Sequence, residues 1–189
     1  MSDLVIRGGR VVDPATGRDE GADVHVEDGT VRAIGTGLEA SEVIDAAGMV
    51  VAPGFVDVHT HLREPGREDE ETIATASAGA AAGGYTAVCA MPNTDPVADS
   101  AAVVEQVWAL GREAGLVEVL PAGALSKGLE GRKMADLGEM ARSLAGVRFF
   151  TDDGHGVQDS LLVRRLMEYL VTFDAVYAEH CEDAALAAG

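Results

Sequence analysis

The hydrophobic pattern changes near residue 53 and divides the chain into two predicted parts. Before this point, short apolar runs separated by turn sequences occur at residues 4–6, 11–12, 22–26 and 31–34. Gly8-Gly9 predicts a tight turn between the first two runs, and Asp28-Gly29 predicts a hairpin between the last two, because both pairs tolerate positive φ. We therefore expect residues 1–52 to form a small all-β subdomain, in which His25 is a solvated strand residue.

After residue 53, short apolar runs alternate with helical segments, which is typical of a parallel sheet built from β-α units. Strands are predicted at residues 55–61, 85–91, 117–125, 147–151 and 175–179, and helices at about 70–82, from 101, around 136–144 and from 159. The acidic residues at 69–71 suit the positive end of the first helix dipole, and Gly83-Gly84 predicts where that helix ends. We expect residues 53–189 to form an α/β domain.

Polar residues gather where the predicted strands end, and the carboxyl ends of the strands of a β/α barrel converge on one mouth, where active sites are built. His59 and His61 lie two residues apart, so they share one strand face with Asp57 and can bind one metal ion together. Adjacent side chains face opposite ways, so only one of Asp152 and Asp153 can point into such a site. Imidazoles and carboxylates are ligand types that suit Zn²⁺.

Charge and composition narrow the possible partners. The net charge is -18, and the summed field repels phosphate backbones and anionic lipid surfaces, so we expect no nucleic-acid or membrane partner. The same acidity also fits a simple adaptation for solubility or high salt. Cys89 and Cys181 form no C-x-x-C motif, and no apolar stretch is long enough to span a bilayer. We therefore predict a soluble cytoplasmic protein with reduced thiols.

Four motifs occur in a fixed order along the chain. They are FVDVHTHLREPG at residues 55–66, MPNT at 91–94, FTDDG at 150–154 and HCED at 180–183. Together they resemble the class I dihydroorotases of the amidohydrolase superfamily, and the resemblance covers essentially all 189 residues. It implies a TIM-type (β/α)8 metallo-dependent hydrolase barrel, of which the first five strands are present. It also implies that the preceding β subdomain is part of a composite β-sandwich.

The resemblance assigns roles to single residues. His59 and His61 match the pair that binds the first of two zinc ions, Asp153 matches the carboxylate that bridges both ions, and His180 matches a ligand of the second. Asp152, His155, Cys181 and Glu182 match no ligand position, and we expect them to orient ligands or to lie in loops.

Two further residues match the family's substrate-binding positions. Arg63 and Asn93 correspond to the residues that hold the substrate carboxylate, which would give an acidic protein a locally basic niche for an anion. The alternative for Arg63 is a surface ion pair with Glu64 or Glu68.

The activity that the resemblance implies is the reversible hydrolysis of dihydroorotate to N-carbamoyl-L-aspartate, in de novo pyrimidine (UMP) synthesis. The family's complete enzyme needs three more strands, another metal-binding histidine and a catalytic aspartate, all of which would follow Gly189. We therefore expect the chain to be an N-terminal portion that is inactive and poorly stable alone, with exposed strand edges. The complete enzyme is expected to be a homo-oligomer.

Two other functions stay open. One is a hydantoinase or allantoinase, which carries a carboxylated lysine where this chain has Asp153; its only lysines are Lys127 and Lys133. The other is a non-catalytic dihydroorotase-like subunit that scaffolds aspartate transcarbamoylase, a partner of this family. Retention of the matching ligand residues argues against an inactive site.

Overall fold

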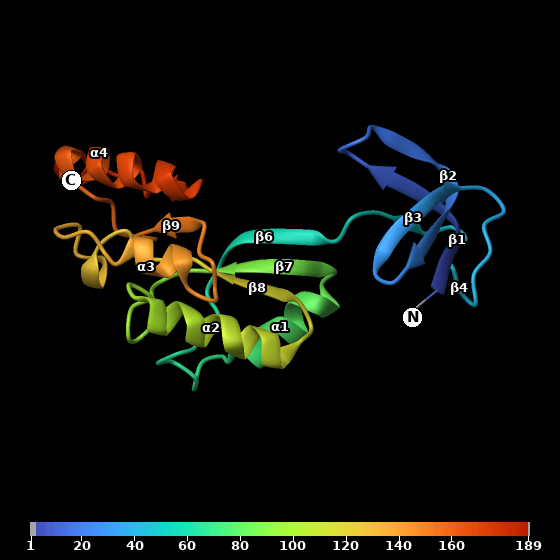
Figure 1. Ribbon diagram of the computed structural model, residues 1–189, viewed down its shortest axis with the longest axis horizontal. Helices are drawn as coiled ribbons and strands as arrows, with labels where there is room; N and C mark the ends of the chain where they lie inside the picture. The colour runs from blue at the N-terminus through green and yellow to red at the C-terminus, as the bar shows by residue number, and fades with distance from the viewer. Residues whose placement is uncertain (1–2, 189) are drawn as a thin grey trace. The chain divides into compact units, whose positions relative to one another are not determined.

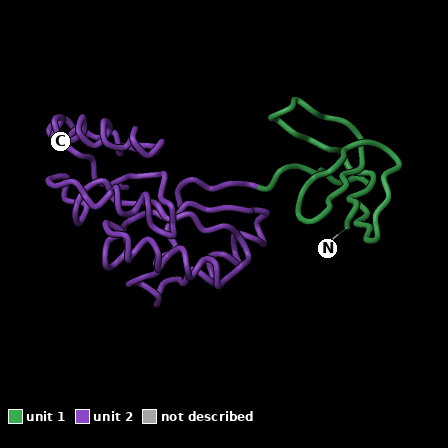
Figure 2. Tube along the Cα trace, in the orientation of Figure 1, with its two compact units in different colours: residues 1–54 green, residues 55–189 purple. Residues whose placement is uncertain are grey.

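Two compact units make up the structure, residues 1–54 and residues 55–189 (Figure 2). The computed structural model describes residues 3–188. In the first unit, the sheet has the order β3-β2-β1-β4, and β5 also pairs with β1. Its strands are β1 (Asp3–Asp13), β2 (Arg18–Glu27), β3 (Thr30–Gly35), β4 (Glu42–Asp45) and β5 (Val50–Val51).

The hairpin between β2 and β3 turns at Asp28 and Gly29, which both have positive φ, as the sequence predicts. The turn predicted at Gly8-Gly9 is wrong, because both glycines lie inside the single strand β1. There the pairing with β2 shifts register between Ile6 and Gly9, so the two glycines form an irregularity within a continuous strand. A Cβ atom on Gly9 would lie 2.6 Å from Cγ2 of Val51, which explains why this position has no side chain.

The second unit contains five parallel strands in chain order, shorter than predicted: β6 (Phe55–Thr60), β7 (Tyr85–Ala90), β8 (Glu118–Pro121), β9 (Phe149–Thr151) and β10 (Val176–Ala178). Strands β6, β7 and β8 form one parallel sheet, and β9 pairs with β10 in another. A parallel bridge between Gly123 and Phe150 joins the two sheets. The strands therefore follow one another around a curved sheet, as in the first part of a barrel.

Helices connect these strands, and α1 and α2 pack on β7 and β8 (Figure 1). The helices are α1 (Ile73–Ala82), α2 (Ala101–Ala114), α3 (Leu137–Arg142), α4 (Ser160–Leu170) and α5 (Ala184–Ala187), with 3-10 turns η1 (Lys127–Leu129) and η2 (Val171–Phe173). Among the described residues, no helix is both long and apolar enough to cross a membrane.

Helix α1 begins three residues later than predicted, and its first turn holds no acidic residue. Thr72 caps the helix instead: its hydroxyl accepts a hydrogen bond from Thr75 N, and the Thr75 hydroxyl accepts one from Thr72 N. Glu64 accepts a further hydrogen bond from Ile73 N at 2.8 Å. A reciprocal side-chain cap therefore starts the helix where the sequence suggested a favourable dipole interaction.

The largest hydrophobic cluster of the second unit lies between α2, α3 and α4 and contains the fully buried Phe150 of β9. A second cluster packs Leu62, which follows β6, against Ile73 of α1 and Val88 of β7. In the described part of the chain, β6 pairs only with β7 and β10 pairs only with β9. Exposed apolar side chains follow these two outer strands: Phe55, Val56, Val58 and Val176.

Candidate metal centre

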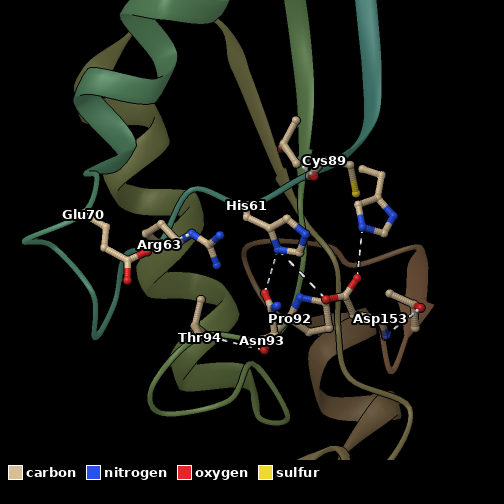
Figure 3. Close-up of polar contacts among 11 residues, drawn as sticks. His61, Arg63, Glu70, Cys89, Pro92, Asn93, Thr94 and Asp153 are labelled. Carbon is tan, nitrogen blue, oxygen red and sulfur yellow. Dashed lines mark hydrogen bonds and ion pairs between the residues drawn. The ribbon is translucent and has the colours of Figure 1, made fainter. Parts of the chain in front are cut away.

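Three polar side chains from two different sheets meet at the ends of their strands. Ligand atoms of His59, His61 and Asp153 all lie within 4.8 Å of one another. His59 Nε2 is 3.0 Å from Asp153 Oδ1, and His61 Nδ1 is 4.0 Å from Asp153 Oδ2. The two imidazoles meet edge to face, with centroids 5.3 Å apart. Figure 3 shows His61 and Asp153 pointing toward each other.

The end of β6 fixes the two histidines. The Thr60 hydroxyl donates to Cys89 O at 2.8 Å, and Met91 N donates to Thr60 O at 2.8 Å, so this strand end stays attached to the β7 segment. Side chains alternate along an extended chain, so the residues before and after Thr60 face away from it together. This alternation brings His59 and His61 to one side, as the sequence predicts. Asp57 lies outside the cluster and accepts a hydrogen bond from His59 N.

The turn after β9 separates the two adjacent aspartates. Asp153 has φ +54 and lies just beyond the end of β9. Its N–H donates to Thr151 Oγ1 at 3.0 Å. Its side chain is 11% exposed and faces the histidines. Asp152 points the other way, is 2% exposed, and accepts hydrogen bonds from the segment after β8. Burial raises the pKa of Asp152, and hydrogen bonds from Ser126 and Leu125 act in the opposite direction.

Asn93 lies beside the histidine pair, with its Oδ1 3.0 Å from His61 Nδ1 (Figure 3). Arg63 Nε is 3.3 Å from Glu70 Oε2, and Arg63 itself has φ +65. The ion pair therefore forms with Glu70 and not with Glu64 or Glu68. The Glu68 carboxylate accepts a hydrogen bond from Gly66 N, and that of Glu64 accepts one from Ile73 N at the start of α1. Sequence reasoning missed Glu70, because only the path of the loop brings it next to the guanidinium.

His180, the fourth ligand that the sequence suggests, lies outside the three-residue cluster. Its Nε2 is 3.0 Å from Glu182 Oε2, and its side chain is substantially exposed. The neighbouring Glu179 accepts a hydrogen bond from Val157 N, and burial raises its pKa. The role of His180 at a second metal stays a prediction.

The remaining sequence candidates are also placed. His155 is exposed, and its N–H donates to Asp152 O. Cys181 is an exposed free thiol, whereas Cys89 is buried, and burial raises the pKa of the Cys89 thiol to about 11. His25 belongs to the first unit, where its Nε2 lies 2.7 Å from Asp3 Oδ1, so this residue, predicted to be solvated, is partly buried and hydrogen-bonded.

The three clustered residues fit a divalent metal ion. Two imidazole nitrogens and one carboxylate are a donor set that Zn²⁺ favours in proteins. A cavity of about 380 Å³ lies beside them and is lined by His59, His61, Glu71 and Tyr85 among others. A larger cavity, about 550 Å³, lies at the far end of α2 near Trp108 and has none of the clustered residues in its wall. Of these two cavities, only the smaller one borders the histidines, and Asp153 is not part of its wall.

Comparison with known proteins points in the same direction. The family model described as dihydro-orotase-like matches residues 48–189. Dihydroorotase of Streptomyces coelicolor is 51% identical over 100% of this chain and 44% of its own length, and that of Mycobacterium tuberculosis is 49% identical over 98% and 43%. This chain thus spans less than half of these curated relatives.

Solved structures are similar as well. L-hydantoinase from Arthrobacter aurescens is 27% identical with a TM-score of 0.62, covering 80% of this chain and 33% of that one. Dihydropyrimidinase from Brevibacillus agri is 26% identical with a TM-score of 0.58, covering 79% and 32%. These similarities confirm the predicted fold, in which five strands and their helices form part of a hydrolase barrel.

Proposed function

Because the chain belongs to the dihydro-orotase-like family, we propose that it contributes the first metal-binding half of a dihydroorotase active site. The proposed reaction is the reversible hydrolysis of dihydroorotate to N-carbamoyl-L-aspartate in de novo pyrimidine (UMP) synthesis. The single observation that supports it most is the convergence of His59, His61 and Asp153. The activity is proposed for a complete eight-stranded barrel, and we expect the 189-residue chain alone to be inactive.

Two zinc ions are the proposed cofactors. His59 and His61 would hold the first ion, Asp153 would be shared by both ions, and His180 would contribute to the second. Bound zinc supplies a Lewis acid for the ring carbonyl and lowers the pKa of water. When His61 Nδ1 carries the proton, it donates to Asn93 Oδ1 at 3.0 Å and leaves Nε2 free to bind a metal. Asn93 therefore has a role in orienting a ligand histidine.

Arg63 is the proposed anchor for the substrate carboxylate, with Asn93 beside it. Its guanidinium already faces a carboxylate, that of Glu70, at 3.3 Å. A substrate carboxylate can take the place of Glu70, because both present the same planar pair of oxygens to the guanidinium. We assign proton transfer to no residue of 3–188, because the family resemblance places the responsible aspartate after the eighth strand.

Hydantoinase or allantoinase activity is the nearest alternative, because the similar solved structures are hydantoinases and a dihydropyrimidinase. These enzymes use a carboxylated lysine at the strand-four position, where this chain has Asp153. Lys127 is engaged elsewhere, with its Nζ 2.6 Å from Asp136 Oδ2. Turnover of dihydroorotate, hydantoin and allantoin by the purified complete protein separates the three activities. Hydrolysis of hydantoin without hydrolysis of dihydroorotate would contradict our proposal.

A non-catalytic subunit that binds aspartate transcarbamoylase is the second alternative. We propose that the protein retains its metal, because both histidines and Asp153 are present and close together. We also propose that the complete protein is a cytoplasmic homo-oligomer. Metal analysis of the purified complete protein tests this. A metal-free protein that co-purifies with aspartate transcarbamoylase and lacks turnover would favour the scaffold instead.

A further inference from the structure

Asp152 is a buried carboxylate that the proposed reaction does not use. It is 2% exposed and precedes Asp153 directly. Its Oδ1 accepts hydrogen bonds from Leu125 N at 2.8 Å and Ser126 N at 2.9 Å, and its Oδ2 accepts one from the Ser126 hydroxyl. All three donors come from the segment that follows β8. Burying a charge without hydrogen-bond partners is costly, and these three donors stabilise the buried Asp152 carboxylate.

The contacts extend beyond Ser126. Its Oγ accepts a hydrogen bond from Gly131 N at 2.8 Å, and Ser126 forms an isolated antiparallel bridge with Met134. The loop after β8 is therefore connected to the Asp152 carboxylate by a network of hydrogen bonds. Strand β9 itself is only three residues long, so strand pairing alone gives little support to the turn that follows it.

This turn determines where Asp153 points. Asp153 adopts the left-handed conformation, which is uncommon for non-glycine residues but is accessible to aspartate. Two backbone hydrogen bonds brace the turn from within: Asp153 N donates to Thr151 Oγ1, and His155 N donates to Asp152 O. The Asp152 side chain ties the turn to the loop after β8, which also pairs with β9 through Gly123. Movement of this turn would change the 3.0 Å contact between His59 and Asp153.

We propose that Asp152 is a positioning residue, which ties the turn after β9 to the loop after β8 and so aims Asp153 at His59 and His61. The inference rests on the proposed function only in treating Asp153 as a metal ligand. Residues that orient ligands commonly change metal affinity about 10- to 100-fold when they are replaced. Asp152 would act on the metal site in this way without touching the metal.

The chemistry of the three donors predicts a graded series of variants. Asp152→Ala removes every acceptor and leaves two buried backbone N–H groups unpaired. Asp152→Asn keeps one oxygen for those two N–H groups but cannot accept from the Ser126 hydroxyl with its amide nitrogen. Ser126→Ala removes only the hydroxyl. The loss of metal affinity should therefore be largest in Asp152→Ala and smaller in Asp152→Asn.

The test titrates Co²⁺ into the metal-free complete protein and follows its visible absorption, with folding checked by circular dichroism. Val104→Ala is the control, because it removes buried apolar packing in α2 and removes no hydrogen-bond acceptor from the turn. We expect Asp152→Ala to bind Co²⁺ about 10- to 100-fold more weakly than wild type, Asp152→Asn to fall between them, and Val104→Ala to match wild type despite lower stability.

A folded Asp152→Ala chain with wild-type Co²⁺ affinity and spectrum overturns the proposal. If that variant does not fold, Asp152→Asn and Ser126→Ala decide, and unchanged affinity in both overturns it. If wild type itself binds no Co²⁺, the proposed metal site fails. The positioning role is then decided by the NMR signals of the His59 imidazole, which should shift in Asp152→Asn and not in Val104→Ala. Signals that stay in place would refute it.

Discussion

His59 Nε2 lies 3.0 Å from Asp153 Oδ1, although His59 lies in β6 and Asp153 follows β9, a strand of the other sheet. The contact depends on the bridge between Gly123 and Phe150, which joins the sheets, and on the turn that points Asp153 inward. It is shorter than the 4.0 Å contact between His61 and the same carboxylate.

Replacing the clustered ligands should remove metal without unfolding the chain. We expect His59→Ala and Asp153→Asn each to lower the zinc content of the purified protein, since each removes one of three converging donors. Elemental analysis after dialysis measures the effect. His25→Ala is the control, because His25 pairs with Asp3 in the other unit. Full zinc content in both ligand variants would rule out this cluster.

Arg63→Met in the complete enzyme should raise KM for dihydroorotate while zinc content stays normal. A lost charge-assisted hydrogen bond costs about 1.5–3 kcal/mol, which corresponds to roughly 10- to 100-fold in binding. Steady-state kinetics and metal analysis of the same preparation measure both quantities. An unchanged KM would remove Arg63 from the substrate site.

Glu70→Gln should have the opposite effect on KM, because it removes the carboxylate that now pairs with Arg63. Asp69→Asn is the matched control, since it removes the same charge from an exposed neighbour that has no contact with the guanidinium. We expect KM to fall in Glu70→Gln only. An equal fall in both variants would point to general electrostatics instead of competition for Arg63.

The two cysteines should differ sharply in reactivity. Burial raises the pKa of Cys89 to about 11, so its thiol stays protonated below that pH, whereas Cys181 is exposed. Iodoacetamide at pH 8 should label one site in the native chain and both sites in denaturant, as mass spectrometry of peptides can show. Rapid native labelling in the Cys181→Ser variant would mean that Cys89 is accessible.

The core of the second unit should depend strongly on Phe150. Phe150 is fully buried in the largest hydrophobic cluster, so Phe150→Ala should lower the free energy of unfolding by about 3–5 kcal/mol. Leu161→Ala is the control, because Leu161 is 53% exposed and should cost far less. Urea denaturation followed by circular dichroism compares the two. Equal losses would mean that burial does not set the cost.

The first unit should lose stability in acid through Asp23. Its carboxylate accepts hydrogen bonds from Gly8 N and Leu38 N, which hold the pKa of Asp23 below its usual value. This stabilisation is present above the ordinary aspartate pKa and is lost as the pH falls through the lower, folded value. We expect the amide signals of Gly8 and Leu38 to move in that pH range. In Asp23→Asn, neither amide should respond to pH there.

Much of the fold could be predicted from the sequence, because apolar runs and glycines mark strands and turns locally. Asp28-Gly29 shows this, since its turn needs only two residues with positive φ. Gly8-Gly9 has the same local signal yet continues a strand, because the partner strand β2 pairs on both sides of it. The tertiary partner decided the outcome, and local sequence does not contain it.

The candidate site divides in the same way. His59 and His61 could be predicted to share a face from their spacing alone, since alternation along a strand is a local rule. The pairing of Arg63 with Glu70 could not, because it depends on the path of a loop with positive φ at Arg63. The anchoring of Asp152 by Ser126 likewise joins segments that are distant in sequence.

The chemistry of the clustered ligands affects which ion the protein would acquire. His59, His61 and Asp153 offer two imidazole nitrogens and one carboxylate oxygen. Such a donor set accepts several divalent ions, and their order of affinity places copper above zinc and zinc above manganese. Which ion is loaded therefore depends on cellular supply, and growth media with different trace metals should yield differently loaded protein.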